Sequence, residues 1–367
     1  MSENKKKYAE VFTPPELVDE IIEILKPIHF SNSLNPRIYE PGIGKGAFLN
    51  KIIEKIPFKS YEGCEINPSK ETFNINPKIN ISIGDFFNQS LNTYDLIIGN
   101  PPFYNDGFKG PPCSKTRKGK TIWPQIVKKC FEHLEPNGIL AMIIPCIWLK
   151  PDKEQIYDLF TTNQILYLRV YSCVESNKLF HYHAQTPCCY VIVQKTHVIN
   201  SFTNSFTNSF MLYDNGFKPF SLKPGYCIPT CNSQLIQNFI PTYKLNMKKV
   251  AFINKSFENK IIKNPTKHFP IITTFKDGPY GFESLKPGLY QGIPKIIMAH
   301  KSLPIPFLDI SGTYGLYGRD KYVFLGPNLH ETFAYLSLPI IQTIIKSFTI
   351  RMNFYEKDIF KYINGSS

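Results

Sequence analysis

Several common functional patterns are missing from this sequence. Its nine cysteines occur singly or as the adjacent pair Cys188-Cys189, and no C-x-x-C pair exists. A zinc ribbon, a dithiol redox motif or another metal site is therefore not expected. No apolar run approaches the length of a membrane span, so no membrane partner is expected. The odd cysteine count and the lack of a signal-peptide pattern favour a reducing, intracellular setting.

Acidic residues are scarce relative to basic ones. The chain has 42 Lys and Arg against 29 Asp and Glu, which gives a net charge of +13 over 367 residues. Such an excess favours a polyanionic partner, above all nucleic acid, although it also serves solubility. Hydrophobic residues make up 43% and aromatic residues 14%, as in globular proteins. The length predicts two domains, or one large and one small.

A glycine-rich turn lacks the spacing of the common phosphate-binding loops. A strand ending at Ile38-Tyr39 leads into Glu40-Pro41-Gly42-Ile43-Gly44-Lys45-Gly46, and a helix follows to about Ile56. Neither G-K-[ST] nor G-x-G-x-x-G is present. Glycines permit a tight turn and close approach of a ligand. The acid that precedes them favours a cationic group or hydroxyls over a pyrophosphate.

The N-terminal region predicts a helix. Apolar residues from Leu17 to Leu25 have helical spacing. Thr13 is expected as the N-cap, Pro14 as the first helical residue and Glu16 as the partner in a capping box. The outward-facing N–H groups of this helix start offer an alternative role in anion binding.

Polar residues end four successive expected strands. Glu40 follows the first, Glu65 ends the strand from Ser60, Asp85-Phe86 follow Ile79–Ile83, and Asn100 follows Asp95–Gly99. Ligands of open α/β sheets bind beyond the carboxyl ends of strands. Glu65 lies where a carboxylate that binds ribose hydroxyls is expected. Asp85 is suited to accept from an adenine amino group, and Phe86 to pack on its ring.

The last of these strands ends in an unusual corner, Asn100-Pro101-Pro102-Phe103. A residue before proline is pushed to the extended region, and the two prolines lack N–H groups. The corner therefore offers an amide oxygen and carbonyl acceptors beside an aromatic ring. This arrangement suits an amino group held flat, although a simple Pro-Pro turn would have the same sequence.

A basic segment, Tyr104–Thr121, follows the corner and is expected to be a loop that grips phosphates. Its cationic residues are Lys109, Lys115, Arg117, Lys118 and Lys120. Further elements are expected as helices at 122–134 and 148–160 and strands at 139–144, 165–171 and 188–194. Beyond a Ser-Phe-Thr-Asn repeat at 201–210, the sequence becomes rich in glycine, proline and aromatic residues.

The motifs at residues 11 to 103 and their order resemble the gamma-class (TaqI-type) S-adenosylmethionine-dependent N6-adenine DNA methyltransferases. The resemblance implies an α/β, Rossmann-like catalytic domain over 1–200, with a mixed, mostly parallel sheet and helices on both faces. Residues 201–212 would form a linker or inserted loop. Residues 213–367 would form an irregular α+β target-recognition domain that binds DNA.

The same resemblance implies roles for individual residues. The methyl donor would be S-adenosylmethionine, leaving S-adenosylhomocysteine as product, and the substrate an adenine flipped out of double-stranded DNA. The residues implied in catalysis are Asn100, Pro101, Pro102 and Phe103. Those implied in donor binding are Thr13, Glu40, Pro41, Gly42, Gly44, Gly46, Glu65, Asp85 and Phe86. Phe103 and Phe180 would contact the target base, with Tyr182 as the rival of Phe180.

Other functions remain open from the sequence. Methyltransferases acting on RNA adenine or on protein glutamine also use Asn-Pro-Pro-aromatic, and an inactive nucleic-acid-binding relative would keep the fold. A protein substrate does not explain the basic charge. An inactive relative would be expected to lose the glycines or the acids, which are intact here. A separate restriction endonuclease that cuts the same site is an implied partner, whereas the oligomeric state is not predicted.

Overall fold

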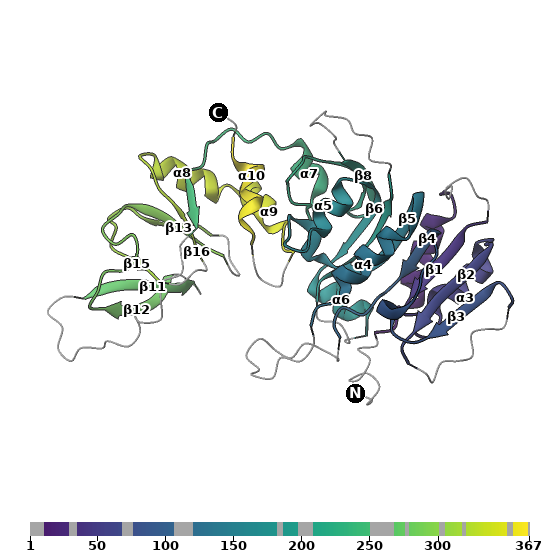
Figure 1. Ribbon diagram of the computed structural model, residues 1–367. Coiled ribbons are helices and arrows are strands. Elements are labelled where there is room, and N and C mark those ends of the chain that lie inside the picture. Colours follow the sequence, from purple (N-terminus) through teal and green to yellow (C-terminus); the bar gives the residue numbers. More distant parts are fainter. Residues whose placement is uncertain are drawn as a thin grey trace. The chain divides into compact units, whose positions relative to one another are not determined.

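The computed structural model describes residues 11–28, 35–67, 76–105, 120–181, 186–196, 208–249, 268–275, 279–300, 305–317, 321–350 and 355–365. The chain divides into two compact units, Met1–Gly225 and Tyr226–Ser367 (Figure 1). Each unit has its own sheets and buried apolar residues.

The first unit is organised by a nine-stranded sheet in the order β3-β2-β1-β4-β5-β7-β6-β8-β9. Its strands are β1 (Arg37–Pro41), β2 (Ser60–Glu65), β3 (Ile79–Ile83), β4 (Tyr94–Gly99), β5 (Leu134–Pro145), β6 (Gln164–Tyr171), β7 (Cys188–Gln194), β8 (Asn208–Tyr213) and β9 (Phe217–Leu222). Strands β3, β2, β1, β4 and β5 pair in parallel, and β7 is antiparallel to both of its neighbours. This order is that of the Rossmann-like methyltransferase fold, which confirms the expected fold class.

The central strands are buried because helices cover the sheet. All six residues of β4 are buried, which explains its continuous apolar sequence. Helix α2 (Pro15–Leu25) buries five apolar side chains and joins one core cluster with α3 (Ala47–Lys55) and with Ile38 and Leu96 of the sheet. Each such side chain contributes about 1.5–3 kcal/mol through burial.

Three further helices complete the first unit: α4 (Trp123–Glu132), α5 (Ile156–Thr161) and α6 (Cys173–Leu179). The single helix expected at 148–160 is wrong. A short 3-10 helix, η3 (Cys146–Leu149), ends before Pro151, and α5 begins only at Ile156. Lys150 is extended, as expected for a residue before proline. Asp152 accepts from the backbone N–H groups of Glu154 and Tyr157 and so begins α5 afresh.

The extent of the first unit differs from the expected division at residues 201–212. Strands β8 and β9 belong to the large sheet, and the unit continues to Gly225. The Arg169 guanidinium on β6 lies 3.8 Å from the ring centroid of Tyr213, and Asn208 Nδ2 donates to Asn163 O. These contacts bind β8 to the sheet. Strand β9 is the last in the sheet order and carries Pro219. Residues 201–207 lie outside the described ranges.

The second unit is a smaller α+β structure with two sheets. A four-stranded sheet has the order β10-β16-β13-β14, and a three-stranded sheet has the order β12-β11-β15. The strands are β10 (Met247–Lys249), β11 (Phe269–Phe275), β12 (Pro279–Ser284), β13 (Lys295–Ala299), β14 (Phe307–Asp309), β15 (Gly315–Leu316) and β16 (Lys321–Phe324). The helices are α7 (Ser233–Asn238), α8 (Leu329–Ser337), α9 (Pro339–Lys346), η5 (Lys357–Ile359) and α10 (Phe360–Ile363).

A buried ion pair joins two strands of the second unit. Lys295 Nζ on β13 lies 2.6 Å from Asp309 Oδ2 on β14, and both side chains are fully enclosed. The Asp309 carboxylate also accepts from the backbone N–H groups of Thr313 and Tyr314, so its charge is compensated. Among the residues that the structure describes, no helix has the length and apolar character needed to cross a bilayer.

Candidate active site at the carboxyl edge of the sheet

The carboxyl ends of β1, β2, β3 and β4, here called the carboxyl edge, bring the sequence-predicted residues together. Strand β1 lies between β2 and β4, so Glu40 and Glu65 lie on adjacent strands and Asn100 follows the third. A Cβ built at Gly42 would lie 3.7 Å from Pro102 Cδ. The glycine loop and the Asn-Pro-Pro-Phe corner are therefore neighbours.

The glycine loop is folded over the end of β2. The backbone N–H groups of Gly42 and Ile43 both donate to Cys64 O, at 3.0 and 3.1 Å. Gly42 and Gly46 have φ angles of 78° and 74°, in the left-handed region that glycine adopts without steric cost. The loop thus turns sharply between β1 and α3, as the sequence predicts.

Glu65 is fixed by two backbone groups from different loops. Its Oε2 accepts from Gly44 N at 2.7 Å, and its Oε1 accepts from Asn67 N at 2.9 Å. Its exposed fraction is 4%. A carboxylate oxygen has more than one lone pair, so each can accept a further hydrogen bond from a ligand hydroxyl. Its position therefore fits the predicted contact with ribose hydroxyls, which stays a prediction.

Glu40 is a buried acid whose hydrogen bond comes from the hydroxyl of Tyr61. Its exposed fraction is 2%. Burial raises the pKa of Glu40 to about 8, the Tyr61 hydrogen bond opposes this shift, and the charge of Glu65 adds to it. A cationic group bound beside Glu40 would oppose this shift and favour the ionised carboxylate. The site therefore favours a ligand that carries positive charge.

The turn after β3 presents one acid and one exposed ring. Asp85 Oδ1 accepts from Phe87 N at 2.9 Å and so caps the 3-10 helix η2 (Phe86–Asn88). Phe86 is 8% exposed and packs near Tyr39, with the ring centroids 6.2 Å apart, whereas Phe87 is 41% exposed. The sequence singled out Phe86, but Phe87 presents the accessible ring. The consecutive phenylalanines were the only indication of this alternative in the sequence.

Asn100 is held by the segment that precedes α2. Its Nδ2 donates to Thr13 Oγ1 at 3.2 Å and to Val11 O at 3.4 Å. Because a backbone carbonyl can only accept, the nitrogen of the Asn100 amide must face Val11. The Oδ1 atom is consequently turned away from this segment, and no hydrogen bond to it occurs among the described residues. The amide oxygen is thus kept as an acceptor.

The expected N-cap role of Thr13 is wrong. Pro14 occupies the N-cap position with an extended backbone, Pro15 is the first helical residue, and no side chain caps α2. The Thr13 hydroxyl instead accepts from Asn100. Two prolines at the helix start lack the N–H groups that a capping side chain would accept from. The Thr13 hydroxyl is therefore available to contact Asn100.

Phe103 connects the corner to α4. The backbone N–H of Ile122 donates to Phe103 O at 3.1 Å, and Tyr104 pairs with Thr121 as an antiparallel bridge. The Phe103 ring is half-buried. Lys120 is exposed beside this bridge, whereas the other predicted DNA-binding residues, Lys109, Lys115, Arg117 and Lys118, lie outside the described residues.

Phe180 lies in the core of the first unit. It follows α6, and its side chain is 4% exposed within the same cluster as Ile143 and Tyr190. The capping box of Ser172 and Glu175 begins α6, and Phe180 directly follows the helix. A contact of Phe180 with a target base stays a prediction and would require the ring to leave this cluster. Its rival Tyr182 lies outside the described residues.

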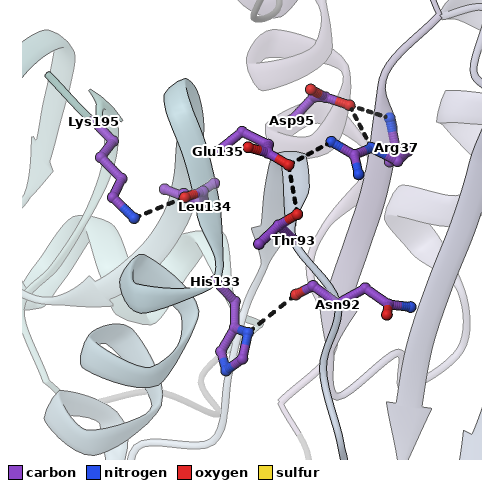
Figure 2. A network of polar contacts seen from close by, with 8 residues as sticks. All are labelled: Arg37, Asn92, Thr93, Asp95, His133, Leu134, Glu135 and Lys195. Carbon is purple, nitrogen blue, oxygen red and sulfur yellow. Dashed lines mark hydrogen bonds and ion pairs between the residues drawn. The ribbon is translucent and has the colours of Figure 1, made fainter. Parts of the chain in front are cut away.

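The opposite edge of the sheet, here called the amino edge, carries a closed network (Figure 2). Arg37 N and Nε donate to Asp95 Oδ2 at 2.8 and 3.2 Å, and Arg37 Nη2 lies 2.8 Å from Glu135 Oε1. Thr93 donates to the same Glu135 oxygen. The carboxylates of Asp95 and Glu135 thus both form ion pairs with Arg37. In the described part of the chain, no group of three or more His, Cys, Asp or Glu side chains is arranged to hold a metal ion.

Comparison with known proteins agrees with this geometry. Residues 40–180 match the family described as Eco57I restriction-modification methylase. The modification methylase CviBIII of Paramecium bursaria Chlorella virus NC1A is 30% identical over 151 residues, which are 39% of this chain and 39% of that protein. The type II methyltransferase M.CvrRI of Paramecium bursaria Chlorella virus XZ-6E is 34% identical over 139 residues, 36% of this chain and 35% of that protein.

The name of a third relative gives a different substrate. A tRNA1(Val) (adenine(37)-N6)-methyltransferase of Porphyromonas gingivalis is 27% identical over 132 residues, 31% of this chain and 52% of that protein. The chain thus matches about a third to a half of the length of these relatives. The match over residues 40–180 agrees with the resemblance to DNA-modifying methyltransferases inferred from the motifs and makes this part of the chain similar to restriction-modification methylases.

Proposed function

We propose that the protein transfers a methyl group from S-adenosylmethionine to the N6 amino group of an adenine flipped out of double-stranded DNA. The orientation of Asn100 carries this proposal, because Thr13 and Val11 hold its amide nitrogen and leave its oxygen to accept. The methylase match at residues 40–180 agrees with S-adenosylmethionine as the methyl donor.

In the proposed mechanism, the Asn100–Phe103 corner activates the adenine amino group, a weak nucleophile, by orienting it. The lone pair of an adenine amino group is delocalised into the ring. Asn100 Oδ1 and the Pro101 carbonyl would accept its two hydrogens, which favours a tetrahedral nitrogen and aims the lone pair. The acceptors are preorganised before the substrate arrives, so orientation and electrostatics supply the rate enhancement. No strong base is required, because the amino proton becomes acidic only once transfer has begun.

The residues of the carboxyl edge fit the proposed methyl donor. When bound, S-adenosylmethionine supplies an activated methyl group whose leaving group is a neutral thioether. Glu65 would accept from the ribose hydroxyls, and Asp85 from the adenine amino group, with Phe86 at the adenine ring. Thr13, Glu40, Pro41 and the glycines at 42, 44 and 46 would hold the methionine end. The buried acid Glu40 suits a donor that carries positive charge.

Duplex DNA fits the charge of the chain. A net charge of +13 favours contact with phosphates, and the basic residues Lys109, Lys115, Arg117, Lys118 and Lys120 follow the catalytic corner in sequence. The Phe103 ring would stack on the extruded base. The second unit, Tyr226–Ser367, would read the target sequence. A separate restriction endonuclease acting on the same site is the proposed biological partner.

Methylation of a sequence-diverse duplex DNA library, followed by mapping of N6-methyladenine, tests this proposal. The expected result is methylation at adenines within one short sequence. Methylation of cytosine, or of no base in the library, would contradict it. A reaction without S-adenosylmethionine is the control for methyl groups already present.

RNA adenine methylation is the second candidate, because the tRNA1(Val) methyltransferase of Porphyromonas gingivalis matches part of this chain. Measuring labelled methyl transfer to structured RNA beside duplex DNA, at equal salt and adenine concentration, separates the two. Faster transfer to DNA supports the main proposal, whereas faster transfer to RNA supports the second.

A further inference from the structure

Lys129 on α4 contacts the turn that carries Asp85. Its Nζ donates to three backbone carbonyls, Phe86 O at 3.0 Å, Phe87 O at 3.1 Å and Gln89 O at 2.9 Å. The ammonium also lies 4.9 Å from the ring centroid of Phe86. A lysine ammonium has three N–H groups, so all of them are satisfied by this one turn.

The same turn is short, and its backbone hydrogen bonds join residues three apart, from Asn88 N to Asp85 O and from Gln89 N to Phe86 O. Its 3-10 helix η2 has three residues, and such helices have poor hydrogen-bond geometry. Asp85 caps its first turn, and the side chain of Gln89 links it to Ser82 on β3. Lys129 supplies a contact from outside this segment, to Phe87 O and Gln89 O and to Phe86 O, which also accepts from Gln89 N. The cation therefore fixes where the turn sits relative to α4.

We propose that Lys129 is a positioning residue for the methyl donor. It holds the Asp85–Gln89 turn in the conformation that binds the adenosine part of the donor. This inference depends on the proposed function, because it assumes that the turn contacts the donor. Lys129 itself points to backbone carbonyls and is not placed against the donor. Its effect reaches the donor through Asp85 and the adjacent aromatic rings.

Lys195 provides a matched control from the amino edge. Its Nζ also donates to three carbonyls, Phe131 O at 3.1 Å, Glu132 O at 3.2 Å and Leu134 O at 2.7 Å. It lies 5.9 Å from the ring centroid of Phe131, and its contact with Leu134 is drawn in Figure 2. Both lysines therefore make the same kind of contact, but Lys129 contacts the turn that carries Asp85, whereas Lys195 contacts the C-terminal end of α4 and the start of β5.

The test compares Lys129→Met with Lys195→Met in the full-length chain. Isothermal titration calorimetry with S-adenosylhomocysteine measures affinity without any nucleic acid, and thermal unfolding measures stability. We expect both variants to lower Tm, whereas only Lys129→Met weakens binding, by roughly tenfold, as for the loss of hydrogen bonds to a charged group. Lys195→Met should bind within about twofold of the wild type.

Two further measurements separate positioning from general destabilisation. 5′-Methylthioadenosine contains the adenosine part but not the methionine end, so Lys129→Met should weaken its binding by the same factor. In transfer assays, Lys129→Met should raise KM for the donor and leave kcat at saturating donor within about twofold. Should Lys129→Met fail to fold, Lys129→Arg, which keeps the charge but changes its geometry, should show a smaller loss of the same kind.

The outcomes distinguish this inference from the function on which it rests. If the wild-type chain binds S-adenosylhomocysteine and Lys129→Met binds it equally well, the inference is wrong and the proposed function stands. An equal loss of affinity in Lys129→Met and Lys195→Met would also overturn it, because the effect would then be general. If the wild-type chain binds neither compound, the proposed function itself is wrong and the inference falls with it.

Discussion

The two edges of the same sheet differ in how their acidic side chains are paired. At the amino edge, the carboxylates of Asp95 and Glu135 share the guanidinium of Arg37. At the carboxyl edge, Glu40 and Glu65 are buried on adjacent strands, and their hydrogen bonds come from a tyrosine hydroxyl and from backbone N–H groups. At the amino ends of these strands, an arginine thus neutralises part of the negative charge of the acids. At the carboxyl ends, the acids have no ion-pair partner among the described residues.

This difference indicates which edge is adapted to a ligand. Burying acids beside each other without a cation raises the free energy of the unliganded protein. Such an arrangement is retained where a bound group compensates it, and perturbed acids in proteins cluster at functional sites. The amino edge has no such deficit, so its polar contacts serve stability. The comparison therefore distinguishes the residues proposed to bind a ligand from the residues that connect the strands of the sheet.

The largest expected effect concerns Asn100. Asn100→Ala should lower methyl transfer by on the order of 10²–10³-fold, as when one preorganised hydrogen-bonding group is removed from an active site. Binding of S-adenosylhomocysteine should remain within about threefold of the wild type. Asn92→Ala at the amino edge is the matched control and should keep its transfer rate. Single-turnover assays with duplex DNA measure the rates, and wild-type transfer by Asn100→Ala would contradict the assigned role.

A second variant, Thr13→Val, tests how Asn100 is oriented. Thr13→Val removes one of the two acceptors that face the Asn100 amide nitrogen, so transfer should fall less than in Asn100→Ala. An effect of Thr13→Val equal to that of Asn100→Ala would indicate that the hydroxyl does more than orient the amide.

The second prediction concerns the pH dependence of stability. Burial raises the pKa of Glu40 from its ordinary 4.5 to about 8, so the folded protein binds a proton that the unfolded chain releases. This contribution to stability is fully present below pH 4.5 and is lost as the pH rises through 8. Its slope is at most about 1.4 kcal/mol per pH unit, or roughly 2–3 kcal/mol between pH 6 and 8.

Glu40→Gln should remove this component, because glutamine does not titrate. Urea denaturation of both proteins at pH 6 and 8 measures the difference in unfolding free energy. Equal changes in the two proteins would show that Glu40 does not hold a proton in the folded state, and the contrast between the edges would weaken.

The third prediction concerns the ring in the corner. Phe103→Ala should lower kcat/KM on duplex DNA by an amount equivalent to about 1–3 kcal/mol, the usual contribution of stacking between a base and an aromatic ring. Phe103→Trp keeps a flat ring and should retain most of the activity. If both variants react at the wild-type rate, the ring has no part in holding the base.

The smallest expected effect belongs to the amino edge. Arg37→Met leaves the buried carboxylate of Asp95 without its cation and should lower the unfolding free energy by about 1–2 kcal/mol, since Arg37 is partly solvated. Tm should then fall by a few degrees. Affinity for S-adenosylhomocysteine should not change, because the contact lies at the far edge of the sheet. A large loss of affinity would contradict the separation of the two edges.

The positions of most strands in the catalytic part of the first unit could be predicted from local sequence. Strands β3 and β7 have the expected bounds, and β4 extends the expected strand by Tyr94 only. Buried parallel strands are short apolar runs that end in turn residues, so each carries its own local pattern. The alignment of Glu40, Glu65, Asp85 and Asn100 at one edge follows from parallel pairing and therefore could also be expected.

Contacts between distant segments could not be predicted. Thr13 and Asn100 meet across 87 positions of sequence, and the local pattern at Thr13 matched a capping box equally well. The inward position of Phe86 and the outward position of Phe87 depend on Tyr39 and Lys129, which come from other elements. Lysines on amphipathic helices are common, so nothing in the sequence distinguishes Lys129 from its neighbours. Tertiary packing decides these positions.

Strand β9 has a consequence for how the protein behaves at high concentration. It forms one edge of the described sheet order and contains Lys218 beside Pro219. A proline cannot contribute an N–H to a β-ladder, and a lysine placed next to it resists burial against another chain. Edge strands of natural proteins use both features against edge-to-edge aggregation. The sequence Phe217–Leu222 thus disfavours the addition of another chain's strand at the β9 edge of the sheet.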